Sequence, residues 1–300
     1  MQYQRSPIDN LKVFFKQKSL LSRLILINIG VFLLISVVNL INYLFQLEPT
    51  GFYGPIVPYL ALPSDLGSLS LKPWTLLTYM FSHESFFHLF FNMLVLYFGG
   101  SIFREYLSKR KLLSMYLIGG ISGGLLYVIS YNYFPVFQNS VTVSVAIGAS
   151  ASVLAILVAI ATYVPNYHVH LLIIGKLRLK YLAIILVVID IISIQGNNPG
   201  GHIAHIGGAL YGFISIMFFK KGFDFSKWLS LPKISFRRGP RKSYSNPNYA
   251  KRPVTDEDYN RKRAANQAEI DKILEKISKS GYASLSKSEK EKLFKMSNKK

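Results

Sequence analysis

The chain has 300 residues, no cysteine, and 35 basic against 15 acidic side chains. It therefore cannot form a disulfide framework or a cysteine-ligated zinc or iron–sulfur site. Half of the residues are hydrophobic and the mean hydropathy is +0.28 although the net charge is +20, so apolar and basic residues must be segregated. Residues 220–300 carry 22 basic and 9 acidic side chains, and the long apolar runs all precede them.

The first 21 residues form a basic N-terminal segment. Within it Ile8, Leu11 and Phe15 recur at helical spacing among lysines. This pattern predicts an amphipathic helix over residues 8–20 that lies on the inner leaflet of a membrane.

Six apolar runs follow, and each approaches the roughly 20 residues needed to cross the hydrocarbon core of a bilayer. The runs are 22–45, 86–106, 112–134, 146–164, 177–194 and 203–219. We therefore expect an all-α membrane protein with a six-helix membrane domain at 22–220. The first run is too long for a removable signal peptide, and no small-residue cleavage site follows it closely. Between the first two runs, the proline-rich residues 46–73 predict an outer loop partly buried in the membrane interface.

The basic residues predict how the chain crosses the membrane. They gather at one end of the runs, for example at Lys109, Arg110 and Lys111, whereas residues 135–145 and 195–202 have no charged side chain. Because cytoplasmic loops keep the positive charges, both termini are expected in the cytoplasm. We expect a multi-pass integral protein of a bacterial cell (inner) membrane.

Polar residues gather at the starts of the second, fourth and sixth runs. They are His83, His88 and Asn92, then Gly148, Ser150 and Ser152, then His202 and His205. In the predicted topology all three starts lie near the outer face, so these side chains share one depth. A hydroxyl nucleophile, an imidazole base and neutral hydrogen-bond donors are the groups that acyl transfer requires.

Spacing separates the roles of the histidines. His88 and Asn92 are four residues apart and share a helix face, whereas His83 is expected on the loop that enters this helix. The pair His83 and His88 is one residue too far apart for a His-Glu-x-x-His zinc helix. We therefore expect no metal and no other cofactor.

Small residues predict which runs pack together. Gly208 and Gly212 lie on the helix face of His205, and the fourth run offers Gly148 and a series of alanines. Small residues let two membrane helices approach closely, so Ser150 is expected within hydrogen-bond reach of His205. Asp190, near the outer end of the fifth run, is interpreted either as a proton-relay residue or as a cap of loop backbone, and capping is the favoured prediction.

The motifs together resemble those of the rhomboid family of intramembrane serine proteases. The resemblance covers most of residues 70–220 and rests on four motifs and one flanking residue. These are Trp74, His83-x4-His88-x3-Asn92, Gly148-Ala149-Ser150 and Ala204-His205-x2-Gly208-x3-Gly212, with Glu105 before a basic cluster.

The resemblance implies a six-helix rhomboid-like bundle with a Ser-His dyad and no aspartate. Ser150 would be the nucleophile, and His205 the general base and then the general acid. The backbone N–H of Ser150 and the side chains of His88 and Asn92 would form the oxyanion hole, and His83 would be a supporting or water-handling residue.

Two residues depart from the family pattern. Ala151 replaces the glycine that usually follows the nucleophile, which adds a methyl group where helices approach. Leu154 replaces an aromatic residue that often packs on the catalytic imidazole, which would leave His205 more loosely held. We expect an effect on rate, not loss of activity.

The substrates implied are transmembrane or membrane-adjacent segments of other membrane proteins, cut near the outer face. The alternative is a catalytically silent relative that binds transmembrane helices as a chaperone or adaptor. A six-span transporter is a weaker interpretation, because transporters carry broken helices or charges near the midplane, and the mid-span regions here are largely apolar.

The basic tail, 221–300, is expected on the cytoplasmic side. It begins with a linker over 232–253 and continues with helical patterns at 256–280 and 287–296. Its charges predict contact with anionic lipid headgroups, with no nucleic acid as partner, and the helical pair is a possible module for an unknown cytoplasmic partner.

Overall fold

The computed structural model describes residues 15, 19–47, 54–171, 175–229 and 256–297. The chain divides into two compact units, which we call the membrane unit (residues 1–233) and the tail unit (residues 234–300). The predicted linker 232–253, and nearly all of the predicted helix 8–20, lie outside the described residues.

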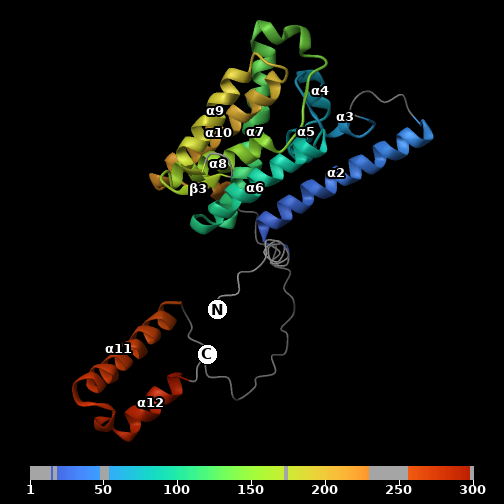
Figure 1. The fold of residues 1–300 in the computed structure, drawn as a ribbon. Coiled ribbons are helices and arrows are strands. Elements are labelled where there is room, and N and C mark those ends of the chain that lie inside the picture. Colours follow the sequence, from blue (N-terminus) through green and yellow to red (C-terminus); the bar gives the residue numbers. More distant parts are fainter. Residues whose placement is uncertain (1–14, 16–18, 48–53, 172–174, 230–255, 298–300) are drawn as a thin grey trace. The chain divides into compact units, whose positions relative to one another are not determined.

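The membrane unit is a helical bundle (Figure 1). Its longer helices are α2 (Leu20–Phe45), α6 (Phe86–Tyr106), α7 (Lys109–Tyr133), α8 (Ser150–Tyr163), α9 (Leu179–Ser193) and α10 (Pro199–Lys220). Four of them, α2, α6, α7 and α10, are long and apolar enough to cross a membrane. The prediction of a mostly helical membrane protein is therefore confirmed. α8 has only 14 residues and α9 only 15.

Each of these four helices begins at a side-chain cap. The hydroxyls of Ser19, Ser85 and Ser108 accept a backbone N–H from the first turn of α2, α6 and α7, and Asn198 does the same for α10. Such caps satisfy N–H groups that have no partner within the helix. The positions of these helices along the chain are therefore set locally.

α8 forms the centre of the bundle. All residues from Ala151 to Ala161 are buried, and the neighbouring helices face α8 with glycines. A Cβ atom on Gly208 of α10 would collide with the backbone carbonyl of Ala151, and one on Gly212 would collide with that of Ala155. The backbones of α8 and α10 are thus in direct contact, an approach that only glycine permits.

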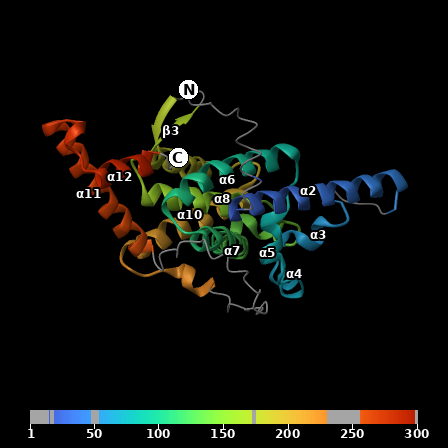
Figure 2. The ribbon, with the colours of Figure 1, turned by 90° about the horizontal axis from the view of Figure 1, so that it is seen from below.

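α2 packs on the bundle mainly through its N-terminal half. Most of its buried residues lie between Leu21 and Asn28, and Asn28 donates a hydrogen bond of 2.8 Å to the Tyr116 hydroxyl on α7. Towards its C-terminal end α2 diverges from the other helices in both Figure 1 and Figure 2.

The end of the bundle where α6, α8 and α10 begin, here called the site end, carries short elements. Between α2 and α6 these are α3 (Val57–Leu60), β1 (Leu62–Pro63), α4 (Leu66–Leu71), α5 (Thr75–Thr78) and the 3-10 turn η1 (Tyr79–Phe81). The turn η2 (Pro135–Ser140) and β2 (Val145–Ala146) precede α8. β1 pairs antiparallel with β2, Leu62 opposite Ala146 and Pro63 opposite Val145.

The described part of the predicted interfacial loop 46–73 packs on protein. Val57 and Ala61 are buried against Ile35 of α2, and Leu62 belongs to the main core. The chain itself therefore buries part of this segment, next to the β1–β2 pair, whereas Tyr59, Leu66 and Leu71 remain exposed.

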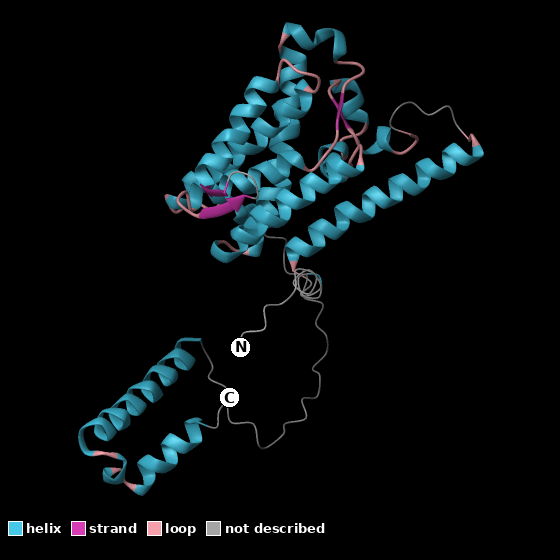
Figure 3. Cartoon of the chain, in the orientation of Figure 1, coloured by secondary structure: helices cyan, strands magenta, loops and turns pink. Residues whose placement is uncertain are grey.

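The opposite end of the bundle contains a hairpin where the predicted runs 146–164 and 177–194 meet, a feature that was not predicted from the sequence (Figure 3). β3 (His168–Leu171) pairs antiparallel with β4 (Gly175–Arg178). At the same end, Lys111 of α7 forms an ion pair of 2.8 Å with Asp224, just before the turn η3 (Phe225–Leu229). Residues 222–229 thus pack with the membrane unit, although the sequence analysis ended that domain at residue 220.

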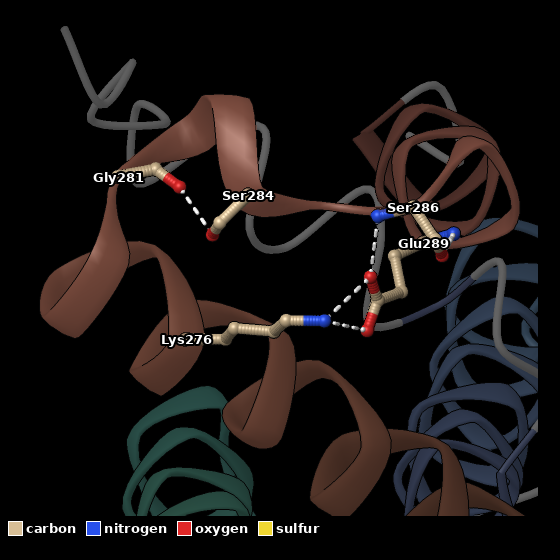
Figure 4. A network of polar contacts seen from close by, with 5 residues as sticks. All are labelled: Lys276, Gly281, Ser284, Ser286 and Glu289. Atoms are coloured by element: carbon tan, nitrogen blue, oxygen red, sulfur yellow. Dashed lines mark hydrogen bonds and ion pairs between the residues drawn. The ribbon is translucent and has the colours of Figure 1, made fainter.

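The tail unit is a helical hairpin of α11 (Asp256–Ser280), the turn η4 (Tyr282–Ser284) and α12 (Lys287–Ser297). Figure 4 shows the polar network at its bend. The Glu289 carboxylate accepts the Ser286 backbone N–H at 2.6 Å, and the Ser286 hydroxyl accepts that of Glu289 at 3.3 Å. This reciprocal capping box begins α12. Glu289 also binds the Lys276 ammonium at 3.0 Å, which ties the two helices together.

Candidate active site

Ser150 is the first residue of the central helix α8. It follows Gly148, whose φ of +124° is rarely adopted by residues with a side chain. A Cβ atom at position 148 would also lie 2.7 Å from His88 Nε2 and 3.6 Å from Ser150 Oγ. The glycine therefore lets the Ser150 hydroxyl and the His88 ring lie close together at the beginning of α8.

A cavity of about 460 Å³ opens beside Ser150. Its wall includes His88 and Asn92 from α6, Ser150 from α8 and His205 from α10. Among the described residues that line it, Ser150 is the one that carries a hydroxyl group. The structure thus brings four of the predicted site residues to one cavity, while Gly208 and Gly212 lie at the helix contact behind it.

Ser152 lies in a different environment. Its side chain is buried, and its hydroxyl faces the sulfur of Met80 at 3.8 Å, next to Gly120 of α7. It is not part of the cavity wall. Two serines that are two residues apart on a helix point to different sides, which separates Ser150 from Ser152.

Asn92 is held by its own helix. Its side-chain nitrogen donates a hydrogen bond of 2.9 Å to the backbone carbonyl of His88, one turn earlier. An amide nitrogen carries two hydrogens, so the second one can serve a group in the cavity. Asn92 is therefore a fixed donor beside His88.

His83 lies on the loop before α6, as its spacing predicts, and does not line this cavity. Its ring is buried and contacts the His88 ring edge-on, with centroids 5.2 Å apart. Within the described residues neither of its ring nitrogens has a hydrogen-bond partner. A second cavity of about 380 Å³, between α2 and the start of α6, adjoins it. A polar site of this size can hold water, in keeping with a supporting position behind His88.

Asp190 lies beside His205. This contact was not predicted from the sequence. One of its oxygens, Oδ1, is 2.8 Å from Nδ1 of His205 and 2.8 Å from Nδ1 of His202. The prediction that Asp190 caps loop backbone is therefore wrong. The expectation of a histidine without an aspartate partner, which rested on the resemblance, also fails at this point.

The sequence does contain a signal for this contact. Asp190 is the single acidic residue between Glu105 and Asp224, and a carboxylate within an apolar run calls for a polar partner. Only a short connection separates the end of α9 from the start of α10. This closeness brings Asp190 to the histidines, which lie three residues apart on one face of α10.

Comparison with known proteins identifies the fold. A model of the rhomboid domain matches residues 70–221, about half of the chain. This chain belongs to the rhomboid family. A second model, for a family of unknown function, matches residues 255–299 of the tail unit.

Three relatives are 30–31% identical to this rhomboid chain over the segments that align. RHOMBOID-like protein 12 of Arabidopsis thaliana, a mitochondrial protein, is 30% identical over 49% of this chain and 47% of its own. The mitochondrial presenilin-associated rhomboid-like protein A of Danio rerio is 31% identical over 44% of this chain and 34% of its own. Rhomboid protease AarA of Providencia stuartii is 30% identical over 50% of this chain and 58% of its own. The chain thus spans about half the length of the relatives it matches.

The two departures from the rhomboid pattern have clear surroundings. A Cβ atom on Gly123 of α7 would lie 2.6 Å from the Ala151 methyl group, so a glycine on the neighbouring helix makes room for that methyl group. Leu154 lines the cavity together with His205. Here His205 has the Asp190 carboxylate as a polar contact.

Asp190, His202 and His205 also form a group that could hold a metal ion. Their donor atoms all lie within 4.8 Å of one another, and carboxylate with imidazole is a donor set that zinc accepts. A metal would need both Nδ1 atoms free of hydrogen, whereas hydrogen bonds to an ionised Asp190 carboxylate need a hydrogen on each. The expectation of a metal-free site stays a prediction.

Proposed function

We propose that this rhomboid is an intramembrane serine endopeptidase, with Ser150 as nucleophile and His205 as general base and then general acid. The observation that carries the proposal is the single cavity that Ser150, His205, His88 and Asn92 line. These groups supply a nucleophile, a base and neutral donors on three different helices.

In the proposed reaction, Ser150 Oγ attacks the carbonyl carbon of the substrate and its proton passes to His205. The negative charge that develops on the carbonyl oxygen is stabilised by the Ser150 backbone N–H and by the His88 and Asn92 side chains. Ser150 opens α8, so its N–H has no partner within the helix and lies at the positive end of the helix dipole. His205 then protonates the leaving amine, and water hydrolyses the acyl-enzyme.

The cavity wall indicates the class of substrate. Phe87 and Phe91 on α6 and Ile189 on α9 line it, and all three are exposed on the bundle surface. An apolar opening between these helices suits a transmembrane or membrane-adjacent segment of another protein. Substrates with small or helix-breaking residues at this depth are preferred, because attack requires an extended backbone.

The proposed topology has six spans with both termini in the cytoplasm. The short length of α8 is compatible with this topology, because α8 is buried among other helices. Backbone groups beyond its ends can therefore be surrounded by protein and need not be exposed to lipid. The site end then faces outward, so that the cavity can admit water. A bacterial inner membrane is the proposed location, with anionic lipids at the basic segments of the inner face.

A serine-reactive fluorophosphonate probe and a model transmembrane substrate test this function. Ser150→Ala abolishes labelling and cleavage, whereas Ser152→Ala, which changes a buried serine outside the cavity, keeps both. Loss of labelling in Ser152→Ala alone would reverse the assignment. A folded wild-type protein that binds transmembrane helices but neither labels nor cleaves would favour the catalytically silent chaperone or adaptor.

Asn92→Ala tests the oxyanion hole. Removing one such donor lowers kcat by about 10- to 1000-fold in other serine enzymes, and we expect a loss in this range, smaller than that in Ser150→Ala. Normal expression with unchanged kcat would make Asn92 a packing residue.

A further inference from the structure

One carboxylate oxygen near the C-terminal end of α9 is within hydrogen-bond distance of two histidines of α10. Asp190 Oδ1 lies 2.8 Å from the Nδ1 atoms of both His202 and His205. The Asp190 side chain is only 10% exposed, and the two imidazole rings meet edge-on with centroids 5.9 Å apart. Both rings are thus held by the same atom.

The shared oxygen limits where the protons can lie. An ionised carboxylate accepts a hydrogen bond from each ring, whereas a protonated oxygen would donate to one ring and accept from the other. The carboxyl group of aspartate is ordinarily ionised at neutral pH. Both contacts form together when the carboxylate is ionised and each Nδ1 carries a hydrogen. In a neutral His205 the other nitrogen, Nε2, then carries none.

With its hydrogen on Nδ1, His205 can act as a base towards Ser150. His205 lines the cavity with Ser150, whereas His202 does not. Since Nδ1 of His205 is bound to Asp190, the bare Nε2 on the other side of the ring is the nitrogen available to a hydroxyl group in the cavity. A base in this tautomer can accept the proton of a serine.

We propose that Asp190 is a positioning residue for His205: its carboxylate fixes the ring and its tautomer and stabilises the imidazolium formed when Ser150 attacks. The inference rests on the proposed protease function and adds a third member to its Ser-His pair. In the step concerned, the O–H bond of Ser150 breaks and its oxygen bonds to the substrate carbon. The proton moves to His205 Nε2 and later to the leaving amine, while Asp190 stays ionised throughout.

His202 provides the matched control. It contacts the same oxygen at the same distance and so shares in joining α9 to α10, yet it does not line the cavity. If Asp190 only joined two helices, removal of either contact would have similar consequences. If it acts through His205, only the loss of the carboxylate impairs the chemical step.

The first experiment compares Asp190→Asn and His202→Ala in the full-length protein. Asp190→Asn keeps the size of the side chain and removes its charge. We expect kcat to fall by about 10- to 10⁴-fold, the upper value being the loss on aspartate-to-asparagine replacement in a serine-protease triad, with KM nearly unchanged. His202→Ala keeps a kcat close to that of the wild type even where melting shows a loss of stability. Equal effects of the two variants on kcat would overturn the proposal.

The second experiment needs no activity. In ¹⁵N-histidine-labelled Ser150→Ala protein in detergent, nitrogen shifts and couplings show which ring nitrogen of His205 carries the proton. We expect the proton on Nδ1, and its transfer to Nε2 or a mixture of tautomers after Asp190→Asn. A proton on Nε2 with Asp190 intact would overturn the proposal. So would stoichiometric zinc lost on removal of any of the three side chains, because ligation would occupy Nδ1.

These results separate the two proposals. Wild-type kcat in Asp190→Asn, together with inactive Ser150→Ala, would overturn the role of Asp190 and leave the protease function in place. A folded wild-type protein without cleavage or labelling would overturn the protease function, and the nitrogen spectra would then decide on their own whether Asp190 fixes the His205 ring.

Discussion

α8 and α9 are almost equal in length and both are strongly apolar, yet they differ in burial. All residues of α8 from Ala151 to Ala161 are buried, whereas α9 buries only Leu179, Ala183 and Asp190. The difference lies at the points of closest helix contact. α8 places Ala151 and Ala155 opposite glycines of α7 and α10, which lets its larger side chains be buried as well, whereas α9 presents isoleucine and valine at its surface. In a membrane, close packing follows from small residues more than from hydropathy.

The two helices are also held in different ways. α8 is held along its length by backbone contacts with α10, whereas α9 is held mainly at its ends. At one end, the Leu179 N–H donates to the Tyr167 carbonyl at 2.8 Å, and at the other, Asp190 binds two histidines. An apolar cavity of about 560 Å³ lies between α9 and its neighbours α8 and α10. The nucleophile is thus on a rigid helix, and the carboxylate is on a loosely packed one.

Replacing the same residue on each helix gives the largest expected contrast. Ile156 on α8 is fully buried and Ile192 on α9 is 71% exposed. Ile156→Ala should lower the free energy of unfolding by about 2–5 kcal/mol, because it removes packing contacts and leaves a cavity. Ile192→Ala should change it little. Reversible unfolding in mixed micelles measures both, and equal losses would break the comparison.

Enlarging one alanine on each helix tests the same difference, with a smaller expected change in stability. Ala155 on α8 lies against Gly119 and Gly212, whereas Ala183 on α9 borders the 560 Å³ cavity. Ala155→Val should cost about 1–3 kcal/mol of stability through overpacking, and Ala183→Val should be neutral or stabilising. If melting showed the two variants to be alike, α9 would be packed as tightly as α8.

The tail unit extends the comparison to a part in which polar contacts join two helices that bury few large side chains, among them Ile273 and Leu285. The backbone N–H of Ser286, together with the Lys276 ammonium, lowers the pKa of Glu289 to about 2. A depressed pKa contributes stability that is complete above the ordinary glutamate pKa of about 4.3 and is lost as the pH falls towards 2. Hydrogen exchange across residues 276–290, corrected for its intrinsic pH dependence, should show this loss. Glu289→Gln should remove it, while Glu275, with an exposed ion pair within α11, supplies the control Glu275→Gln.

The smallest expected effect is that of removing the tail. Truncation after Lys233 keeps the Lys111–Asp224 ion pair and every residue of the proposed site. Cleavage of a model substrate in detergent should retain its wild-type kcat. A truncated protein with normal melting behaviour but no cleavage would make the tail part of the active enzyme.

Much of the cavity could be predicted from the sequence because its polar residues stand at the beginnings of apolar runs. Ser150, His88, Asn92 and His205 lie at the starts of alternate helices, and alternation of direction alone brings such starts to one end of a bundle. The glycines of α10 likewise predict a close approach to α8. These inferences need only helix period, side-chain size and the number of crossings.

The remaining features depend on contacts between segments whose sequences carry no mutual signal. The hydrogen bonds of Asp190 depend on the angle at which α9 meets α10, which hydropathy does not determine. The β1–β2 pair has only two residues in each strand, too few for a recognisable alternation. The position of Asp224 beside Lys111 likewise became evident only once α7 and the segment after α10 were placed in space.

The length of α8 has a consequence for substrate choice. Its 14 residues measure about 21 Å at 1.5 Å per residue, against a hydrocarbon core of roughly 30 Å. In the proposed topology, Ser150 at its first residue is therefore several ångströms below the outer headgroups. The length of α8 then sets the depth of Ser150 in the bilayer. In thicker or thinner bilayers, hydrophobic mismatch changes which substrate residue lies level with Ser150. The acyl-chain length of the lipids should therefore move the cleavage position along a given substrate.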